Sequence, residues 1–510
     1  MSRIGQLARE TVIYGISSII GRLLNWLLVP LYTQFMAPAD YGIVTELYAY
    51  VAFLVILYTY GMETAFFRFA AKDQSTSDEV FNQIQTSILA TTLVFSAALI
   101  LLATPITEFL EYPGKERYIY WFAVILAIDS IVSIPFAKLR LAGKAKRFAV
   151  AKLVNIMINI GLNLFFIVFC LKISEGSFLK DLRPVIDKFF RRENLADYVF
   201  LSNLIANGAL LFLLSDLLLK FRPQFNFRKM KQIYIYAFPL LVMGLAGVTN
   251  EMLSRAMLKK WLPEGYYPGI TNQAALGIFG AAYKLSVFMS LAIQAFRYAA
   301  EPFFFSRSSD RDSKVLFGQV MHWFIIFGCI IFVGISLNLD IIGWLFLRSD
   351  SYRSGIIVVP VLLLANLFLG VYYNLSAWFK LTDKTYWGTI ISVGGAAITV
   401  ILNIILIPAA GYFGSAVVTL VCYISMSMLS YFLGQKYYPV HYAVAKDIFY
   451  ILAAAGFVVV GNVLTTGMPG LDKGIHLGLI LFFLFLIYAT DRKNIIQLSG
   501  RLKIHGNKYR

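Results

Sequence analysis

Six charged side chains lie inside long apolar runs of the sequence, and their types are suited to binding an anion. An Arg or Lys at mid-bilayer costs roughly 2.5 to 3.5 kcal/mol on insertion scales, so such residues usually face a cavity or a partner. Guanidinium forks and an ammonium point charge are what a diphosphate needs in a desolvated site. The cations are Arg22, Arg255, Lys284 and Arg297, and the acids are Asp129 and Glu251. The excess of cations favours an anionic ligand.

Several of these charges also have a structural interpretation. Arg22 and Asp129 both lie near mid-depth, so they could form an ion pair that holds two helices together. Glu251 and Arg255 lie four residues apart on one helical face, which allows a local salt bridge; alternatively, they line the external half of a central cavity. Lys284 has no obvious acidic partner at its depth.

Two further arginines lie at the expected cytoplasmic ends of their apolar runs. Arg68 and Arg297 are either interfacial anchors or residues that capture an anionic group as it enters. Glu63, near Arg68, joins the two acids above as a candidate coupling or structural acid. Glu46 and Asp216 lie near run ends and give no specific indication.

The elements that must position these charges are transmembrane helices. The 510 residues are 59% hydrophobic and only 14% charged, outside the range of soluble domains. Since a helix needs about 20 apolar residues to cross the bilayer, the recurring runs predict an all-α membrane protein of about fourteen transmembrane helices, with twelve or thirteen still open. The predicted spans are 10–33, 43–67, 84–106, 118–138, 150–171, 198–219, 232–258, 272–300, 315–338, 355–378, 386–407, 413–433, 447–464 and 475–490. Pro135, Pro239, Pro302 and Pro360 are expected to break helices at membrane depth.

The distribution of basic residues predicts the orientation. Roughly twice as many Lys and Arg fall on the side that holds both termini, which predicts cytoplasmic termini in the cell inner membrane. Basic clusters at 138–152, 220–231 and 492–510 are expected to meet anionic lipids. The net charge of +17 is not accompanied by a nucleic-acid-binding motif, so no nucleic-acid partner is expected.

A short repeat predicts two related halves. The pattern A-x-x-G-I-x4-Y at 39–48 reappears at 274–283, and FRFAA at 67–71 corresponds to FRYAA at 296–300. A six-helix repeat gives two lobes of the same orientation, related by an axis along the membrane normal, with a substrate path between them. The expected domains are an N-terminal lobe at 1–225, a C-terminal lobe at 226–435, two extra helices at 436–490 and a basic tail at 491–510.

The sequence lacks motifs for covalent or cofactor chemistry. It has no P-loop, dinucleotide fingerprint or HExxH motif. Its three cysteines lie in apolar runs, and its four histidines are not paired at metal-ligand spacing. The one long external connection, 172–197, is expected to form a short surface helix. We therefore expect no cofactor, no metal site and no enzymatic activity.

Each half contains further motifs. The first half has Tyr14-Gly15 and Gly21-Arg22 in its first span, followed by YTQFMAPADYG at 32–42 and YGME at 60–63; the second half has YAFP at 236–239 and Gly277-Ile278 with Tyr283-Lys284. With the layout of spans, they resemble the polysaccharide-export, Wzx-type oligosaccharide flippases. These form a branch of the multidrug/oligosaccharidyl-lipid/polysaccharide (MOP) superfamily, related to lipid II flippases and MATE exporters.

The resemblance implies a V-shaped pair of six-helix lobes, two extra helices and alternating access. It implies an undecaprenyl-diphosphate-linked oligosaccharide as cargo, such as a repeat unit of O-antigen, capsule or exopolysaccharide, and polymerase machinery as a partner. Arg22 and Arg255 would meet the diphosphate. Our leading hypothesis is that Arg68 and Arg297 admit the head group, Arg22 and Lys284 hold it, and rocking lobes release it outside.

Two other classes of function stay open. A drug or cation antiporter on the same fold would need acidic groups facing the cavity. A membrane glycan transferase or ligase would be expected to have a large external catalytic loop, which the 172–197 connection is too short to provide.

Overall fold

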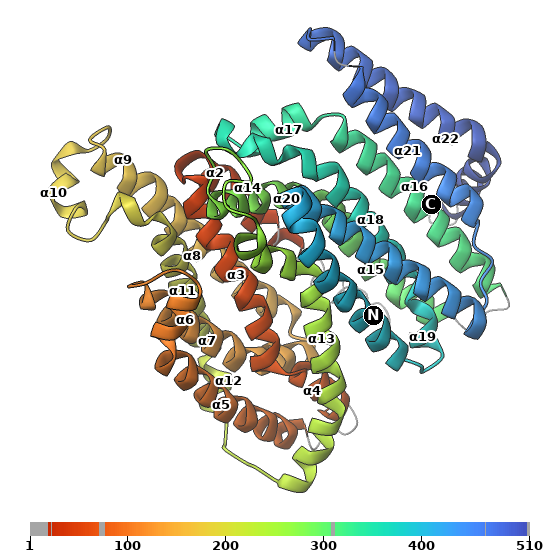
Figure 1. Ribbon diagram of the computed structural model, residues 1–510. Coiled ribbons are helices and arrows are strands. Elements are labelled where there is room, and N and C mark those ends of the chain that lie inside the picture. The colour runs from red at the N-terminus through yellow and green to blue at the C-terminus, as the bar shows by residue number, and fades with distance from the viewer. Residues whose placement is uncertain (1–18, 22, 71–76, 308–311, 465, 507–510) are drawn as a thin grey trace.

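The computed structural model describes residues 19–21, 23–70, 77–307, 312–464 and 466–506, apart from the side chains of 298, 299, 301–303, 305–307, 469 and 493–506. The described chain is all helical. A first group of helices occupies one side of the molecule in Figure 1, in warm colours. It comprises α2 (Leu28–Phe35), α3 (Pro38–Thr59), α4 (Met62–Ala70), α5 (Ser77–Leu101), α6 (Ala103–Phe109), α7 (Glu116–Leu141), α8 (Ala145–Leu164), α9 (Leu171–Ser174), α10 (Arg183–Ile186), α11 (Leu195–Leu213) and α12 (Ser215–Leu219).

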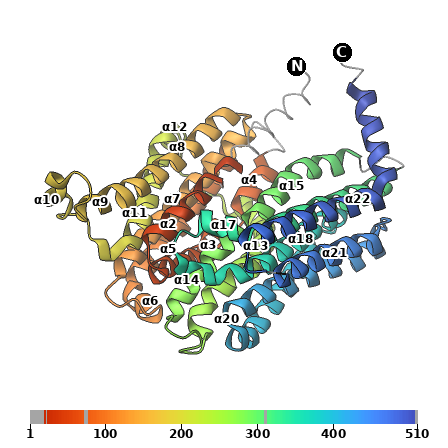
Figure 2. The same cartoon turned by 90° about the horizontal axis from the view of Figure 1, so that it is seen from above.

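A second group lies beside the first, and α13 and α14 border α3 where the groups meet (Figure 1). Seen from above, α10 lies at one end of the molecule and α21 and α22 at the other (Figure 2). The second group comprises α13 (Phe227–Trp261), α14 (Asn272–Leu285), α15 (Val287–Arg307), α16 (Ser313–Ser336), α17 (Leu339–Phe346), α18 (Val359–Leu375), α19 (Ala377–Leu381) and α20 (Tyr386–Tyr437), followed by α21 (Val444–Val463) and α22 (Pro469–Gly506).

The described residues contain 11 helices long and apolar enough to cross a membrane, or up to 12 when the bent pair α14 and α15 counts as one span. The helix α20 is two helices joined at Gly411, whose φ of 55° lies in the region that favours glycine. The predicted span at 10–33 includes residues 10–18 and 22, which lie outside the described residues. The membrane-protein class is confirmed, and the count of fourteen stays a prediction.

Prolines do not break the helices as expected. The helices α7, α13 and α15 run through Pro135, Pro239 and Pro302, and Pro360 lies in the first turn of α18, where a missing N–H leaves no hydrogen bond unmade. Neighbouring helices and local adjustments can satisfy the carbonyls that an interior proline frees. A bend of 44° lies instead between α14 and α15, next to Ser286.

The connection predicted at 172–197 is folded rather than extended. After a π-helical segment at Phe165–Cys170 and α9, it contains 3-10 turns at Lys180–Leu182 and Arg192–Asn194 on either side of the four-residue α10. Phe190 packs in the core against Tyr198, with ring centroids 4.8 Å apart. The expected short surface helix is therefore present as α10.

Candidate functional site

The two helix groups touch through the repeated motif itself. A Cβ placed on Gly42 of α3 would lie 2.1 Å from the carbonyl oxygen of Gln273, and one on Gly277 of α14 would lie 1.9 Å from the carbonyl oxygen of Pro38. Both distances are far shorter than a van der Waals contact, so only glycine permits this approach. The two glycines hold equivalent positions in the repeat, and the contact is reciprocal, as in a two-fold interface.

A buried polar cluster lies beside this contact. The fully buried Glu46 accepts a hydrogen bond from the Tyr112 hydroxyl at 2.5 Å, and Gln273 Oε1 lies 2.8 Å from the same hydroxyl. Burial raises the pKa of the Tyr112 hydroxyl well above its usual range, so the hydroxyl keeps its proton and acts as a donor. Lys259 donates to the Leu110 carbonyl at 2.6 Å and lies 3.6 Å from Glu46 Oε2 and 3.1 Å from Glu111 Oε2.

This cluster joins the groups at one end of α3, because Glu46 and Tyr112 belong to the first group and Lys259 and Gln273 to the second. The sequence gives little sign of it. An acid near the end of an apolar run is common, and its tyrosine and lysine partners lie far away in the chain. A signal does exist: Glu46 follows the repeated glycine by one helical turn and so shares its face.

Three of the predicted site residues, Arg255, Lys284 and Glu251, come together on α13 and α14. The Arg255 guanidinium lies over the Tyr283 ring, 3.8 Å from its centroid. Lys284 follows Tyr283 and interacts electrostatically with both Arg255 and Glu251. Arg255 also interacts with Tyr41 of α3. The helices α13 and α14 thus bring two cations and one acid together, and Arg255 of this group lies next to α3.

The local salt bridge between Glu251 and Arg255 is not formed. In the described part of the chain neither residue makes an ion pair; Arg255 donates Nη1 to the Met252 sulfur at 2.8 Å, and its buried Nε has no hydrogen-bond partner. A guanidinium that lies over an aromatic ring still has N–H donors without a hydrogen-bond acceptor. Arg255 can therefore still bind an anion. Its side chain is buried, whereas those of Glu251 and Lys284 are exposed.

The position of Lys284 is set by a break in its helix. The indole N–H of Trp26 donates to the Lys284 carbonyl at 2.9 Å, and α14 ends one residue later, at Leu285. The bend that follows frees carbonyls that a straight helix would use internally, and Trp26 takes one of them. The segment preceding α2 therefore contacts the second group directly at the candidate site.

Arg68 and Arg297 each lie over the ring of a tyrosine on a neighbouring helix. Arg68 is exposed at the end of α4, with its guanidinium 4.2 Å from the centroid of Tyr236 on α13. Arg297 of α15 is half-buried, 4.1 Å from the centroid of Tyr373 on α18. Arg68 and Arg297 belong to α4 and α15, whereas Arg255 and Lys284 belong to α13 and α14. The tyrosines that Arg68 and Arg297 contact are not the tyrosine that Arg255 contacts.

The remaining predicted residues lie elsewhere. Glu63 pairs with Arg140 of α7. Asp129 accepts a hydrogen bond from Asn207 at 3.0 Å and interacts electrostatically with Lys152. Arg22 lies outside the described residues, so its predicted pairing with Asp129 and its predicted role at the site stay predictions. Neither Glu63 nor Asp129 joins the cationic cluster.

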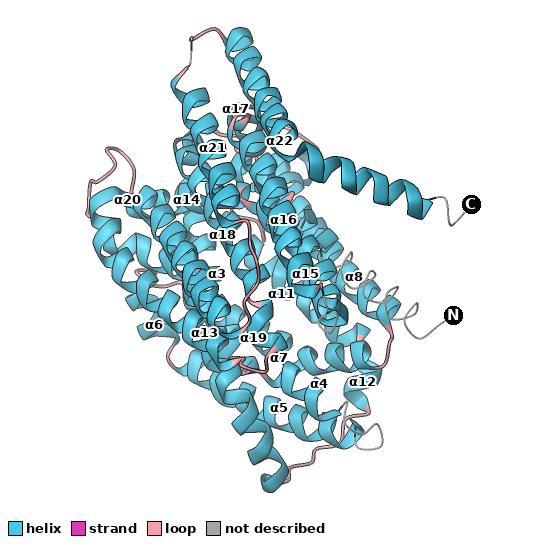
Figure 3. Ribbon diagram, turned by 90° about the vertical axis from the view of Figure 1, so that its right-hand side faces the viewer, coloured by secondary structure: helices cyan, strands magenta, loops and turns pink. Residues whose placement is uncertain are grey.

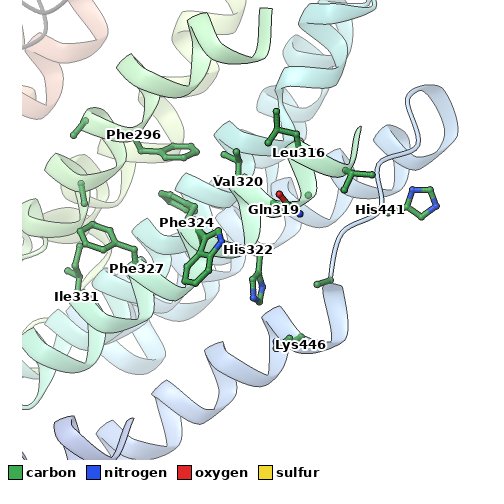
Figure 4. Close-up of a pocket in the computed structure, with 16 residues that line it drawn as sticks. Phe296, Leu316, Gln319, Val320, His322, Phe324, Phe327, Ile331, His441 and Lys446 are labelled. Carbon is green, nitrogen blue, oxygen red and sulfur yellow. The ribbon is translucent and has the colours of Figure 1, made fainter. Parts of the chain in front are cut away.

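A pocket of about 940 Å³ lies between α15, α16 and the segment that connects α20 to α21. Its walls are mainly apolar, and Gln319, His322, His441 and Lys446 provide polar groups (Figure 4). His322 is buried and contacts Asp447 and Asp491. The sequence gives no indication of this group, because His322 lies 125 and 169 positions away from the two aspartates.

Comparisons with known proteins identify a similar sequence family and similar folds. Residues 7–177 match the sequence model of the family described as polysaccharide biosynthesis protein. No curated protein matches the sequence. The lipid II flippase MurJ, in an inward closed conformation, superposes with a TM-score of 0.68 at 13% identity, over 94% of this chain and 99% of that one. The chain therefore shares the fold of this flippase.

Two MATE structures support the same assignment of the fold. An inward-facing multidrug resistance MATE family transporter of the MOP superfamily gives a TM-score of 0.61 at 12% identity, covering 84% of this chain and 97% of that one. A mutant of the Vibrio cholerae MATE transporter VcmN gives 0.52 at 14% identity, covering 85% and 96%. The chain described here is thus a multi-pass membrane protein that shares the fold of these structures.

Proposed function

We propose that this MOP-fold protein is a flippase that moves an undecaprenyl-diphosphate-linked oligosaccharide from the cytoplasmic to the outer leaflet by alternating access. The observation that carries the proposal is the buried guanidinium of Arg255, which makes no ion pair with any described residue and has Lys284 as a cationic neighbour. The match of the first third of the chain to the polysaccharide biosynthesis family, and the likeness to a flippase of lipid II, support a lipid-linked glycan as cargo.

The charge of the site favours a diphosphate. Burying a charged group without a partner costs several kcal/mol, so such a group is retained where a ligand supplies the opposite charge. Arg255 and Lys284 together carry two positive charges and Glu251 one negative charge, which leaves a net attraction for an anion. Arg22 is proposed to add a further cation from the first span, on the basis of sequence.

The reciprocal glycine contact and the Glu46 cluster form one closed end of the transport path. By the distribution of basic residues, this end faces outward and both termini face the cytoplasm of a cell inner membrane. Arg68 and Arg297 lie on the opposite, cytoplasmic side, where they are proposed to attract the diphosphate before it reaches Lys284. The lobes then rock, the outer end opens, and the lipid tail stays in the bilayer.

Translocation requires no covalent step, because the protein needs only to lower the barrier for moving a polar head group through hydrocarbon. Asp129, Glu251 and Glu63 are proposed as coupling or structural acids. We also propose the domain division at 225, 435 and 490, contact of the basic segments with anionic lipids, and cooperation with polysaccharide polymerase machinery.

A second function, export of a cationic drug, is favoured by one observation: Glu251 is exposed and free of ion pairs within the described part of the chain. Such a carboxylate could bind an organic cation. The two neighbouring cations argue against it, because like charges raise the cost of bringing a cation to the same site.

Ligand binding by the purified protein distinguishes the two functions. We expect a short-chain polyprenyl diphosphate to bind more tightly than the corresponding monophosphate or tetraphenylphosphonium. Arg255→Gln and Lys284→Gln should each weaken diphosphate binding by roughly tenfold or more, since charge-assisted hydrogen bonds contribute about 1.5 to 3 kcal/mol. Tight binding of tetraphenylphosphonium that is lost in Glu251→Gln, with no binding of diphosphate, would instead establish the antiporter.

A further inference from the structure

A buried ionic cluster joins the last two long helices to the rest of the protein. His322 of α16, Asp447 of α21 and Asp491 of α22 are all nearly inaccessible to solvent. His322 Nδ1 lies 2.5 Å from Asp447 Oδ1, and Nε2 lies 3.2 Å from Asp491 Oδ2. One imidazole therefore faces carboxylate oxygens of two different helices with its two ring nitrogens.

The number of protons in this arrangement follows from the ring. A neutral imidazole has one N–H, so it can donate to one carboxylate and must face the other with a lone pair. Both contacts become hydrogen bonds only when the ring is doubly protonated or one carboxyl group carries a proton. Either way, the three groups together hold one proton more than a neutral histidine and two ionised aspartates.

We propose that His322, Asp447 and Asp491 form a proton-binding site that fastens α21 and α22 to α16. Loss of the shared proton removes one hydrogen bond of the ring and leaves a carboxylate facing a ring lone pair, which is costly in a buried place. The proposal does not depend on the nature of the cargo.

Other charged and polar groups lie around the imidazole. Lys446 Nζ lies 2.6 Å from Asp491 Oδ1, and the Tyr450 hydroxyl donates to Asp491 Oδ2. Cys329 of α16 interacts electrostatically with Asp447. From α15, Ala292, Ala295 and Phe296 present apolar groups to the same pocket, and α18 meets α16 through Leu367 beside Gly328. Among the described side chains, no set of three His, Cys, Asp or Glu is arranged to hold a metal ion.

The pocket of about 940 Å³ borders the site. His322 and Lys446 line it, together with Gln319 and His441 (Figure 4). The imidazole therefore lies beside a cavity that also holds other polar side chains.

Asp491 lies where α22 bends, so the site affects how firmly α22 is held. The backbone leaves helical geometry at Asp491, with φ −114° and ψ 15°, where the apolar part of α22 ends. Figure 3 shows the remainder of α22 leaving the bundle in a different direction. The helix α21 packs along α16 and α22 packs on both, so a site that joins the three at this bend controls how firmly the pair is held.

Hydrogen–deuterium exchange of the full-length protein in lipid nanodiscs tests the proposal. Protection of the backbone amides in 444–463 and 470–492 is measured between about pH 6 and pH 9, with correction for the intrinsic pH dependence of exchange. We expect wild-type protection to fall about tenfold or more as the pH rises, because one buried carboxylate then loses its hydrogen bond to the ring. In His322→Gln, protection should be low and independent of pH.

Two further variants sharpen the test. Asp447→Asn removes one carboxylate, so a neutral imidazole can satisfy the site; protection should stay high at every pH. This variant also serves if His322→Gln fails to fold. His441→Gln is the matched control, because His441 lines the same pocket but is exposed, and it should behave as the wild type does. Constant wild-type protection over the pH range, or pH dependence that survives in Asp447→Asn, would overturn the proposal.

Discussion

Gly42 and Gly277 lie against each other's helices through equivalent surfaces. The Gly42 position touches the carbonyl of Gln273, and the Gly277 position touches the carbonyl of Pro38; in the repeat, Gln273 is the counterpart of Pro38. A single sequence motif thus forms both sides of the contact between the lobes. Such a self-complementary contact can close tightly and still separate, because it involves two narrow helix faces rather than an interlocked core.

Replacing either glycine should prevent this closure. For Gly277→Leu we expect at least a tenfold loss of transport with normal insertion, since even a Cβ would lie 1.9 Å from the Pro38 carbonyl oxygen and the helices would have to move apart. The measurement is transport in vesicles, together with disulfide trapping between cysteines introduced in α3 and α14. Gly247→Leu is the control, because a Cβ at Gly247 meets no atom within 4 Å. Equal transport by both variants would contradict the contact's role.

The Glu46 cluster should stabilise the closed end. We expect Glu46→Gln to lower the free energy of unfolding by about 1 to 3 kcal/mol, because it weakens a buried hydrogen bond and leaves Lys259 with only the exposed Glu111 as an acidic partner. Thermal unfolding in detergent measures the change. The exposed Glu108 supplies a matched variant, Glu108→Gln, that should unfold as the wild type does. No difference between the two variants would show that the cluster does not hold the lobes together.

Arg255 should separate stability from function. Its contact with Tyr283 contributes about 0.5 to 2 kcal/mol, while an unpaired buried cation costs several kcal/mol, so Arg255→Gln should unfold at the same temperature as the wild type or a higher one. Diphosphate binding should fall roughly tenfold or more at the same time. Lys436→Gln, on an exposed lysine, should change neither quantity. A large loss of stability in Arg255→Gln would make the residue structural.

Arg68 should act on capture rather than on the translocation step. We expect Arg68→Gln to raise the apparent KM for cargo about threefold or more with little change in kcat, because an exposed cation attracts the ligand before it is bound. Initial rates in proteoliposomes at several cargo concentrations give both quantities, and raised salt should reduce the difference from wild type. Lys146→Gln is the control, since Lys146 is also exposed. An unchanged KM would leave Arg68 as an interfacial anchor.

The sequence was sufficient for the class of fold, because hydrocarbon requires long apolar helices and leaves few alternatives. It also placed Glu251 and Arg255 on one helical face, since four residues make about one turn. It did not predict that Lys284, for which no acidic partner was expected, interacts electrostatically with Glu251. The repeat at Gly42 and Gly277 indicated related halves but not that the two motifs touch each other. That contact depends on how two lobes dock, which a periodic pattern does not encode.

Long-range polar clusters could not be predicted. Tyr112 meets Glu46 across 66 positions, and His322 meets Asp491 across 169. Each residue by itself resembles an ordinary charge near a span end. The expectation that Pro135 and Pro239 break their helices is also wrong, because packing in the bundle compensates for the hydrogen bond that each proline removes.

The most direct test of the proposed function is the leaflet location of lipid-linked oligosaccharide in cells depleted of this protein. A probe that reaches only external sugars measures the exposed cargo, and extraction measures the total. The account predicts that intact cargo accumulates on the cytoplasmic side, and that wild type and Lys436→Gln restore exposure while Arg255→Gln does not. Normal external exposure in depleted cells, or full restoration by Arg255→Gln, would contradict it.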